Sequence, residues 1–137
     1  AYAIAASAQT ISAPITGGVG SVGVVRMHLD MSEMLKAWGL NVSLIHAGKH
    51  KVDGNPFNPL PDTVREEWQA GIEALRRMFA EYVSAGRGMS VDAVLETEAR
   101  FYNDPPQIQE AQRLGLIDGI AAPDVALAAL VAHVAQP

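Results

Sequence analysis

The feature that most constrains the fold is a long amphipathic helix, which the sequence predicts over residues 63–84. Thr63 and Glu66 have the spacing of a capping box, in which two side chains bond free backbone amides at a helix start. Gly86 and Gly88 follow the pattern and end the helix. Apolar side chains recur over about five turns, which predicts one face packed in the core or against another subunit. They are Val64, Trp68, Ile72, Leu75, Phe79, Tyr82 and Val83.

Short apolar segments alternate with helices along the rest of the chain. Strands are predicted at residues 10–13, 22–27, 41–45 and 116–120. Helices are predicted at residues 1–8, 29–38 and 90–95, after Asp104, and from Pro123 onward. This alternation predicts an α/β fold with parallel strand pairing. Four short strands make a thin sheet for so many helices, so residues 1–137 are interpreted as the C-terminal portion of a single domain.

Composition narrows the class of protein. Apolar residues make up 49% and charged residues 18% of the chain, which indicates a globular core. The net charge of −5, with no basic block, argues against a nucleic-acid partner, and the lack of cysteine excludes thiol catalysis. The apolar run at residues 125–134 is too short to span a bilayer and predicts a packed helix. Ala1 begins inside an Ala-rich pattern without a basic leader, which indicates a fragment or a trimmed product.

The common site motifs are incomplete. The histidines form no i, i+4 pair on a predicted helix, so neither a metal site nor a cofactor is expected. They are His28, His46, His50 and His133. The Gly-x-x-Gly-x-x-Gly run at residues 17–23 lacks the Gly-Lys-Ser/Thr of a phosphate-binding loop. Glu66 and Glu67 are predicted on a solvated helix face, and Ser7 is predicted to bond back to the preceding turn rather than act as a nucleophile.

Lys51 lies in a loop bounded by glycine and proline after an apolar segment. A lysine amine has a pKa near 10.4 in water, and burial among apolar groups lowers it. The neutral amine can then take the proton of a serine, as in Ser-Lys nucleophilic catalysis. Ser21, in a glycine-rich turn, could orient that amine. The alternative, from spacing alone, is that Lys49 and Lys51 are two surface lysines in a solvated loop.

Several ordered motifs resemble the signal peptide peptidase A (protease IV) family. They are Gly-Ser-Val-Gly-Val at residues 20–24, Gly-Lys-His-Lys at 48–51, Gly-Arg-Gly at 86–88, and Gln-Glu-Ala with Gly-Leu-Ile-Asp at 109–118. Within that family, residues 50–56 and 60–66 are most similar to the head-maturation proteases of lambdoid phages. The resemblance covers residues 2–120, and residues 103–108 depart from it by an insertion that includes two prolines.

The resemblance implies a site and a fold. Lys51 takes the place of the general base, and Ser21 that of the serine that positions it. The nucleophilic serine falls about two residues upstream of Ala1, and the oxyanion donors also lie outside the chain. The implied fold is a Clp-protease/crotonase-like spiral of β-β-α units, of which this chain is the C-terminal portion with a long helical arm. The implied assembly is a homo-oligomer.

The implied function is that of a serine endopeptidase with a Ser-Lys dyad, which cuts scaffold, portal or capsid proteins in the bacterial cytoplasm or the phage prohead. One alternative is a membrane-associated cellular protease IV that degrades signal or membrane peptides. Others are a non-catalytic assembly module and a crotonase-type acyl-CoA enzyme, because one fold supports several chemistries. A peptidase requires Lys51 and an acyl-CoA enzyme does not. Residues 1–137 alone are expected to be inactive.

Overall fold

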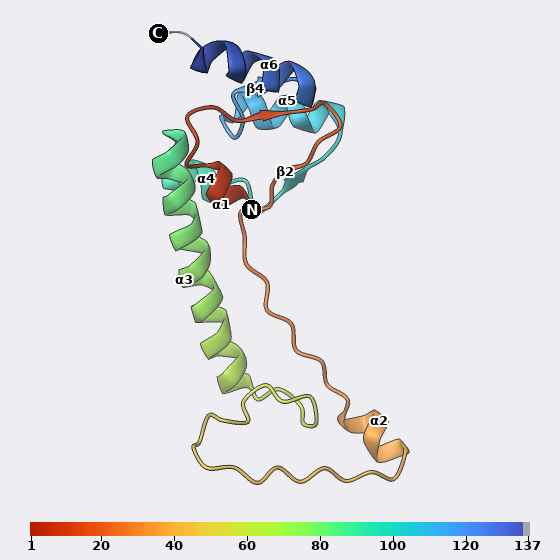
Figure 1. The fold of residues 1–137 in the computed structure, drawn as a ribbon. Coiled ribbons are helices and arrows are strands. Elements are labelled where there is room, and N and C mark those ends of the chain that lie inside the picture. The colour runs from red at the N-terminus through yellow and green to blue at the C-terminus, as the bar shows by residue number, and fades with distance from the viewer. Residues whose placement is uncertain (136–137) are drawn as a thin grey trace. The chain divides into compact units, whose positions relative to one another are not determined.

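The computed structural model describes residues 1–135 (Figure 1). The chain divides into two units. One unit consists of Ala1–Gly23 and the chain from Arg76 onward, and the other is Val24–Leu75. The boundary at residue 75 falls inside the long helix α3, Asp62–Arg87, which therefore contributes to both units.

The first unit contains most of the regular structure. Its elements are α1 (Tyr2–Ala5), β1 (Ser12–Ala13), β2 (Val19–Gly20), the end of α3, α4 (Val91–Leu95), β3 (Phe101–Tyr102), α5 (Pro105–Arg113), β4 (Gly119–Ile120) and α6 (Pro123–Val134). β1 pairs with β4 in parallel, as the alternation of elements predicts. β2 pairs with β3 antiparallel, with Val19 opposite Tyr102. The predicted parallel pairing is thus confirmed for one of two small sheets.

Helix starts follow the local sequence closely. The Ser90 hydroxyl accepts a hydrogen bond of 3.1 Å from the Ala93 amide and begins α4. The Asp104 carboxylate accepts one of 2.9 Å from the Gln107 amide, and prolines occupy the first turn of α5. Both caps confirm the prediction, because a side-chain oxygen at this position satisfies an amide that has no partner within the helix.

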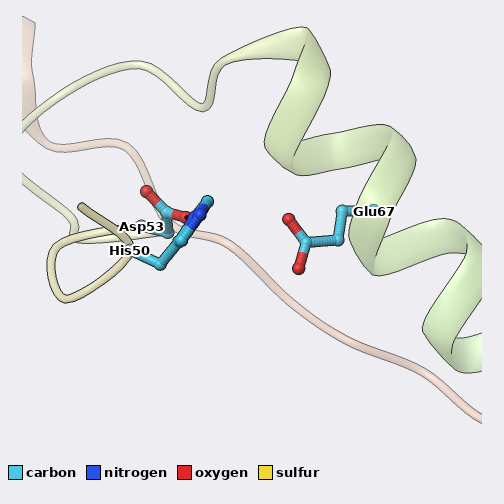
Figure 2. Close-up of side chains that lie close together, drawn as sticks. All are labelled: His50, Asp53 and Glu67. Atoms are coloured by element: carbon cyan, nitrogen blue, oxygen red, sulfur yellow. Dashed lines mark hydrogen bonds and ion pairs between the residues drawn. The ribbon is translucent and has the colours of Figure 1, made fainter. Parts of the chain in front are cut away.

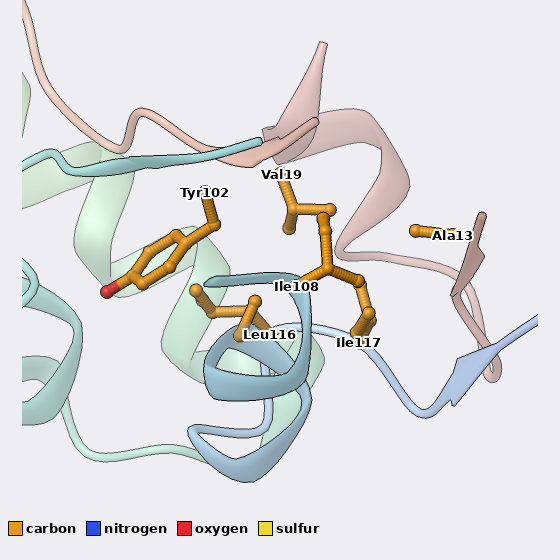
Figure 3. Packing of buried hydrophobic residues seen from close by; sticks show 7 residues of the cluster. Ala13, Val19, Tyr102, Ile108, Leu116 and Ile117 are labelled. Carbon is orange, nitrogen blue, oxygen red and sulfur yellow. The ribbon is translucent and has the colours of Figure 1, made fainter. Parts of the chain in front are cut away.

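Two clusters of buried apolar side chains form the core of the first unit. The larger joins the sheets to α5 and the segment after it (Figure 3). Its members are Ala13, Val19, Tyr102, Ile108, Ala111, Leu116 and Ile117. The smaller consists of Ala6, Val22, Ala80, Val83 and Val94. Tyr2 and Met89 pack against both clusters, so α1 is attached to the same core as α5.

Gly86 lies within α3 rather than ending it, and it permits a close approach. A Cβ atom at Gly86 would lie 1.9 Å from the carbonyl oxygen of Ala6. α3 ends instead at Arg87, and Gly88 follows it with a φ of +65°, a left-handed conformation that glycine adopts without strain. The helix begins at Asp62, so Thr63 lies inside it and the predicted capping position at Thr63 is wrong.

The second unit contains α2 (Ser32–Ala37), the first part of α3 and long connections. The predicted strands at residues 22–27 and 41–45 are wrong, since neither segment pairs with another strand in the described part of the chain. Val25 is 90% exposed and Ile45 fully exposed. An apolar run therefore did not suffice for a strand, which needs a partner to bond its backbone groups. The predicted helix at 29–38 is confirmed in shortened form, and Gly39 follows it with a φ of +72°.

α6 differs from the packed helix that the sequence predicts. Its large apolar side chains are all more than half exposed. They are Val125, Leu127, Leu130, Val131 and Val134. No described element of the first unit, to which α6 belongs, covers them. None of the described helices has both the length and the apolar character of a membrane span.

Candidate active site

Short backbone turns shape the loop that carries Lys51, residues 47–56, which we call the lysine loop. The Lys51 amide donates to the Gly48 carbonyl at 3.2 Å, and the Asp53 amide donates to the His50 carbonyl at 3.4 Å. Gly48 and Gly54 have φ angles of +105° and +69°, which reverse the chain at little steric cost. The loop is therefore a succession of tight turns with Lys51 inside it.

Asn55 and Trp68 fix the end of the lysine loop. The Asn55 side chain donates to the Val52 carbonyl at 2.8 Å and accepts from the Phe57 amide at 2.9 Å. Its backbone oxygen lies 3.0 Å from His28 Nε2. A Cβ atom at Gly54 would lie 1.9 Å from the ring of Trp68, so glycine lets the loop rest directly on this α3 side chain. Asn55 thus acts as an internal brace for the turn after Lys51.

Lys51 itself is exposed, and its side chain has no hydrogen-bond or ion-pair partner in the part of the chain that the structure describes. Lys49, two residues earlier, is exposed as well. The burial that a lysine base requires is therefore not supplied by its own unit, Val24–Leu75. The role of Lys51 stays a prediction that rests on its place in the loop.

Ser21 follows β2 in a strained but well-supported turn. Its φ of +55° lies in the left-handed region, and its side chain is exposed. The Ser21 amide donates to the Arg100 carbonyl at 2.8 Å, and its own carbonyl accepts from the Gly23 amide at 2.9 Å. Ser21 and Lys51 belong to different units, so the predicted contact between them also stays a prediction.

A largely apolar pocket of about 550 Å³ opens beside Ser21 in the first unit. Residues of α1, β1, β2 and β3 line it, among them Ala1, Tyr2, Ser12, Ser21 and Phe101. Phe101 crosses closely over the turn, since a Cβ atom at Gly18 would lie 2.4 Å from its ring. The pocket has room for an apolar side chain, and the start of the chain lies at its wall.

Tyr2 attaches α1 to the far end of the sequence. Its hydroxyl donates to the Leu116 carbonyl at 2.5 Å. Burial, offset in part by the Arg87 charge, raises the pKa of the Tyr2 phenol to about 12. The phenol therefore stays protonated and remains a hydrogen-bond donor across the neutral pH range.

Arg87 and Asp118, which belong to two of the recognised motifs, form an ion pair with an N–O distance of 2.7 Å. The Arg87 side chain is almost fully buried, and its Nε also donates to the Gly115 carbonyl at 3.0 Å. The second oxygen of Asp118 accepts from the Ile11 amide at 2.7 Å. The hydrogen bonds from Arg87 and Ile11 lower the pKa of the Asp118 carboxyl. The sequence marked both residues as family positions but did not predict that they pair.

Another group of polar side chains lies in the second unit and includes His50, next to Lys51. His50, Asp53 and Glu67 place one ring nitrogen and two carboxylate oxygens within 4.8 Å of one another (Figure 2). This group was not predicted from the sequence, because its histidine has no second histidine at i, i+4 on a helix. The available signal was His-x-x-Asp within one tight turn, followed by a glutamate on the next helix.

The order of these motifs and the α/β architecture around them define a class of protein. Residues 1–136 match the model of peptidase family S49, and the chain belongs to that family.

Individual relatives include two phage proteins. The chain is 47% identical over 103 residues to the capsid assembly protease C of Escherichia phage lambda, covering 75% of this chain and 23% of that protein. It is 41% identical over 119 residues to the head-tail preconnector protein of Enterobacteria phage P21, covering 87% and 24%. A putative protease of Methanocaldococcus jannaschii is 31% identical over 140 residues, covering 100% and 44%. The chain thus spans about a quarter of the length of the two phage relatives.

Proposed function

We propose that the protein containing these residues is a serine endopeptidase that uses a Ser-Lys dyad, with Lys51 as the general base and Ser21 as the residue that orients it. The observation that carries the proposal is membership of peptidase family S49 together with the ordered motifs around both residues. Exclusion of the crotonase-type alternative rests on the same match. A non-catalytic assembly role is the weaker alternative, because it gives no reason for the lysine loop and Lys51 to match the peptidase motif.

The chemistry requires Lys51 to be neutral when the nucleophile is activated. A neutral amine accepts the serine proton, and the serine oxygen then attacks the peptide carbonyl. Since Lys51 is exposed within its own unit, the groups that desolvate it would come from outside Val24–Leu75, from elsewhere in the protein or from a neighbouring subunit. The braced lysine loop would hold the amine in one place while they do so.

The nucleophile would lie about two residues before Ala1, at the head of α1. A serine at a helix start has the backbone amides and the dipole of the helix nearby, which favour the developing negative charge. Tyr2 and the close contact between Ala6 and Gly86 hold α1 against the core. These contacts support a fixed nucleophile beside the 550 Å³ pocket, where a substrate side chain would bind.

The finer fold and the assembly are also part of the proposal. The Clp-protease/crotonase-like spiral accounts for short strands connected by helices, with a long helical arm formed by α3. A homo-oligomer would cover apolar side chains that are exposed in a single chain, such as Tyr82 on α3 and Leu130 on α6. An enclosed assembly would also restrict substrates to unfolded or tethered chains.

The substrates favoured by the relatives are proteins of the phage head. Two relatives carry names that refer to capsid assembly and to the head-tail preconnector. The proposed place of action is therefore the bacterial cytoplasm or the prohead. The putative protease of Methanocaldococcus jannaschii, which matches along the whole chain, favours a cellular peptidase as the second candidate. Signal or membrane peptides are the substrates that we propose for this alternative.

The test uses the full-length protein with its cognate scaffold, portal and capsid proteins, and with a synthetic signal peptide. Cleavage of head proteins is expected to be lost in Lys51→Ala and kept in Lys49→Ala, which changes a lysine of the same loop. A fall of at least about 10³-fold in the cleavage rate is expected for loss of the base. Full cleavage by Lys51→Ala would refute the dyad, and cleavage of the signal peptide alone would favour the cellular alternative.

A further inference from the structure

We propose that His50, Asp53 and Glu67 form a binding site for a divalent cation of the zinc class. The histidine offers a ring nitrogen and each acid a carboxylate oxygen, and these atoms lie within 4.8 Å of one another (Figure 2). Nitrogen and oxygen ligands of zinc lie at about 2.0–2.2 Å, so ligand atoms around one ion are about 3.3 Å apart. His50 Nδ1 and Asp53 Oδ2 are 2.8 Å apart in a hydrogen bond, which an ion at that nitrogen would replace once the ring proton has moved to the other nitrogen. A rotamer change of the exposed Glu67 side chain would complete the approach.

A hydrogen bond between His50 and Asp53 does not account for the whole group. That pair is satisfied within its own turn, since the two residues are three positions apart. Glu67 comes from a different element, α3, and its carboxylate extends toward the pair in Figure 2. A second carboxylate close to the first raises the electrostatic energy unless a cation lies between them. A metal ion with three protein ligands would remove that repulsion.

The net charge of the pocket around His50, Asp53 and Glu67 favours a cation. His50, Asp53 and Glu67 line a pocket of about 510 Å³ together with Arg26 and Trp68. The Arg26 guanidinium lies 3.5 Å from the centre of the Trp68 ring, and it forms no ion pair with either carboxylate in the described chain. Two negative groups and one positive group leave a net negative pocket when His50 is neutral, which is the form that binds metal.

The two supporting elements are fixed before any ion binds. The turns of the lysine loop set His50 and Asp53, and the contact of Gly54 with Trp68 places the loop directly on α3 next to Glu67. Because the backbone of both elements is fixed, only side-chain entropy, chiefly that of Glu67, is lost on binding. An ion at this site would join the lysine loop to α3 at the residue before Lys51. The site does not depend on the proposed peptidase activity.

The test is a titration of the full-length protein with zinc, followed by calorimetry. One zinc ion per chain is expected, with affinity at least about tenfold weaker in His50→Ala and in Glu67→Gln. His46→Ala changes an exposed histidine just before the lysine loop, and Glu66→Gln changes the neighbouring exposed acid of α3, so both controls should bind like the wild type.

Two results would overturn the site. One is zinc binding no tighter than the millimolar range in the wild-type protein. The other is a loss of affinity that the control variants share equally, since this would place the ion elsewhere or in no specific site. All four substitutions are at exposed positions, so the variants are expected to fold, and circular dichroism of each checks this. Because binding is measured without any peptide substrate, failure of the dyad would leave the result unaffected.

Discussion

Substitution of two glycines of α3 by alanine should change stability in opposite directions. Gly71 and Gly86 both lie inside α3, and a Cβ atom at Gly71 would meet no other atom within 4 Å. Alanine in a helix interior is favoured over glycine by about 0.5–1 kcal/mol. Gly71→Ala should therefore raise the free energy of unfolding by about that amount.

Gly86→Ala should lower the free energy of unfolding, although alanine also has the higher helix propensity at this position. The new Cβ atom would lie 1.9 Å from the carbonyl oxygen of Ala6 and 2.7 Å from its carbonyl carbon. Both are backbone atoms, so relief requires a shift of α1 rather than a rotamer change. Overpacking of this kind costs about 1–3 kcal/mol, and the upper end applies where backbone must move. After subtraction of the propensity gain, a net loss of about 2 kcal/mol is expected.

Urea denaturation of the full-length variants, followed by circular dichroism, measures both changes. A shift in midpoint without a change in slope reports stability alone. Gly86→Ala is also expected to cleave peptides more slowly, because α1 is the helix at whose head the nucleophile is proposed. If Gly86→Ala were as stable as Gly71→Ala, the close contact between α3 and α1 would be refuted.

Two further predictions concern the core of the first unit. Ile108→Ala should lower the free energy of unfolding by about 2–5 kcal/mol, because the side chain is fully buried, whereas Ile4→Ala, at an exposed position, should change it by less than about 0.5 kcal/mol. Asp118→Asn should cost only about 1 kcal/mol, since the carboxylate is 42% exposed and solvent screens its charge. The pKa of the Asp118 carboxyl is lower in the folded state than in the unfolded state, where it is about 4. The stabilisation is therefore complete above the unfolded pKa and is lost as the pH falls through the folded pKa. Denaturation curves of the wild type and of Asp118→Asn should converge in acid.

The sequence predicted elements best where short-range chemistry decides. Ser90 and Asp104 cap their helices as expected, and Gly39 and Gly115 have the positive φ angles typical of helix ends. The Ser7 hydroxyl donates to the Ile4 carbonyl at 2.7 Å, in agreement with its predicted bond to the preceding turn. In each case the partner lies within four residues, so the local sequence contains the whole interaction.

Predictions failed where a distant partner decides. The apolar runs at 22–27 and 41–45 have strand composition but no strand partner in the described residues. β3 was missed because it is two residues long and is defined by its pairing with Val19 and Gly20. The sequence could not show that the apolar face of α6 is exposed, since an exposed and a buried apolar helix have the same composition.

In the candidate site too, local motifs could be predicted from the sequence and contacts between distant residues could not. The motifs around Lys51 and Ser21 located the two loops, but the roles and the contact of these residues stay predictions. The pairing of Arg87 with Asp118 joins motifs far apart in the chain, and composition carries no signal for it. The approach of Glu67 to His50 depends on how the lysine loop lies on α3, which the Gly54 contact with Trp68 determines.

The two segments that would carry the proposed dyad, the lysine loop and α1, are stabilised by contacts of different range along the sequence. The lysine loop depends on turns that join residues only three positions apart, and on contacts within Val24–Leu75. α1, at whose head the nucleophile is proposed, depends on the bond from Tyr2 to Leu116, and the chain after it on the bond from Ile11 to Asp118. Each bond spans more than a hundred residues of sequence. Because long-range contacts form only when the intervening chain has folded, the base loop can adopt its shape early and α1 cannot be fixed until the last third is in place. Assembly of the active site would therefore be limited by the nucleophile side, and damage near Asp118 would reduce activity before it altered the loop that carries the base.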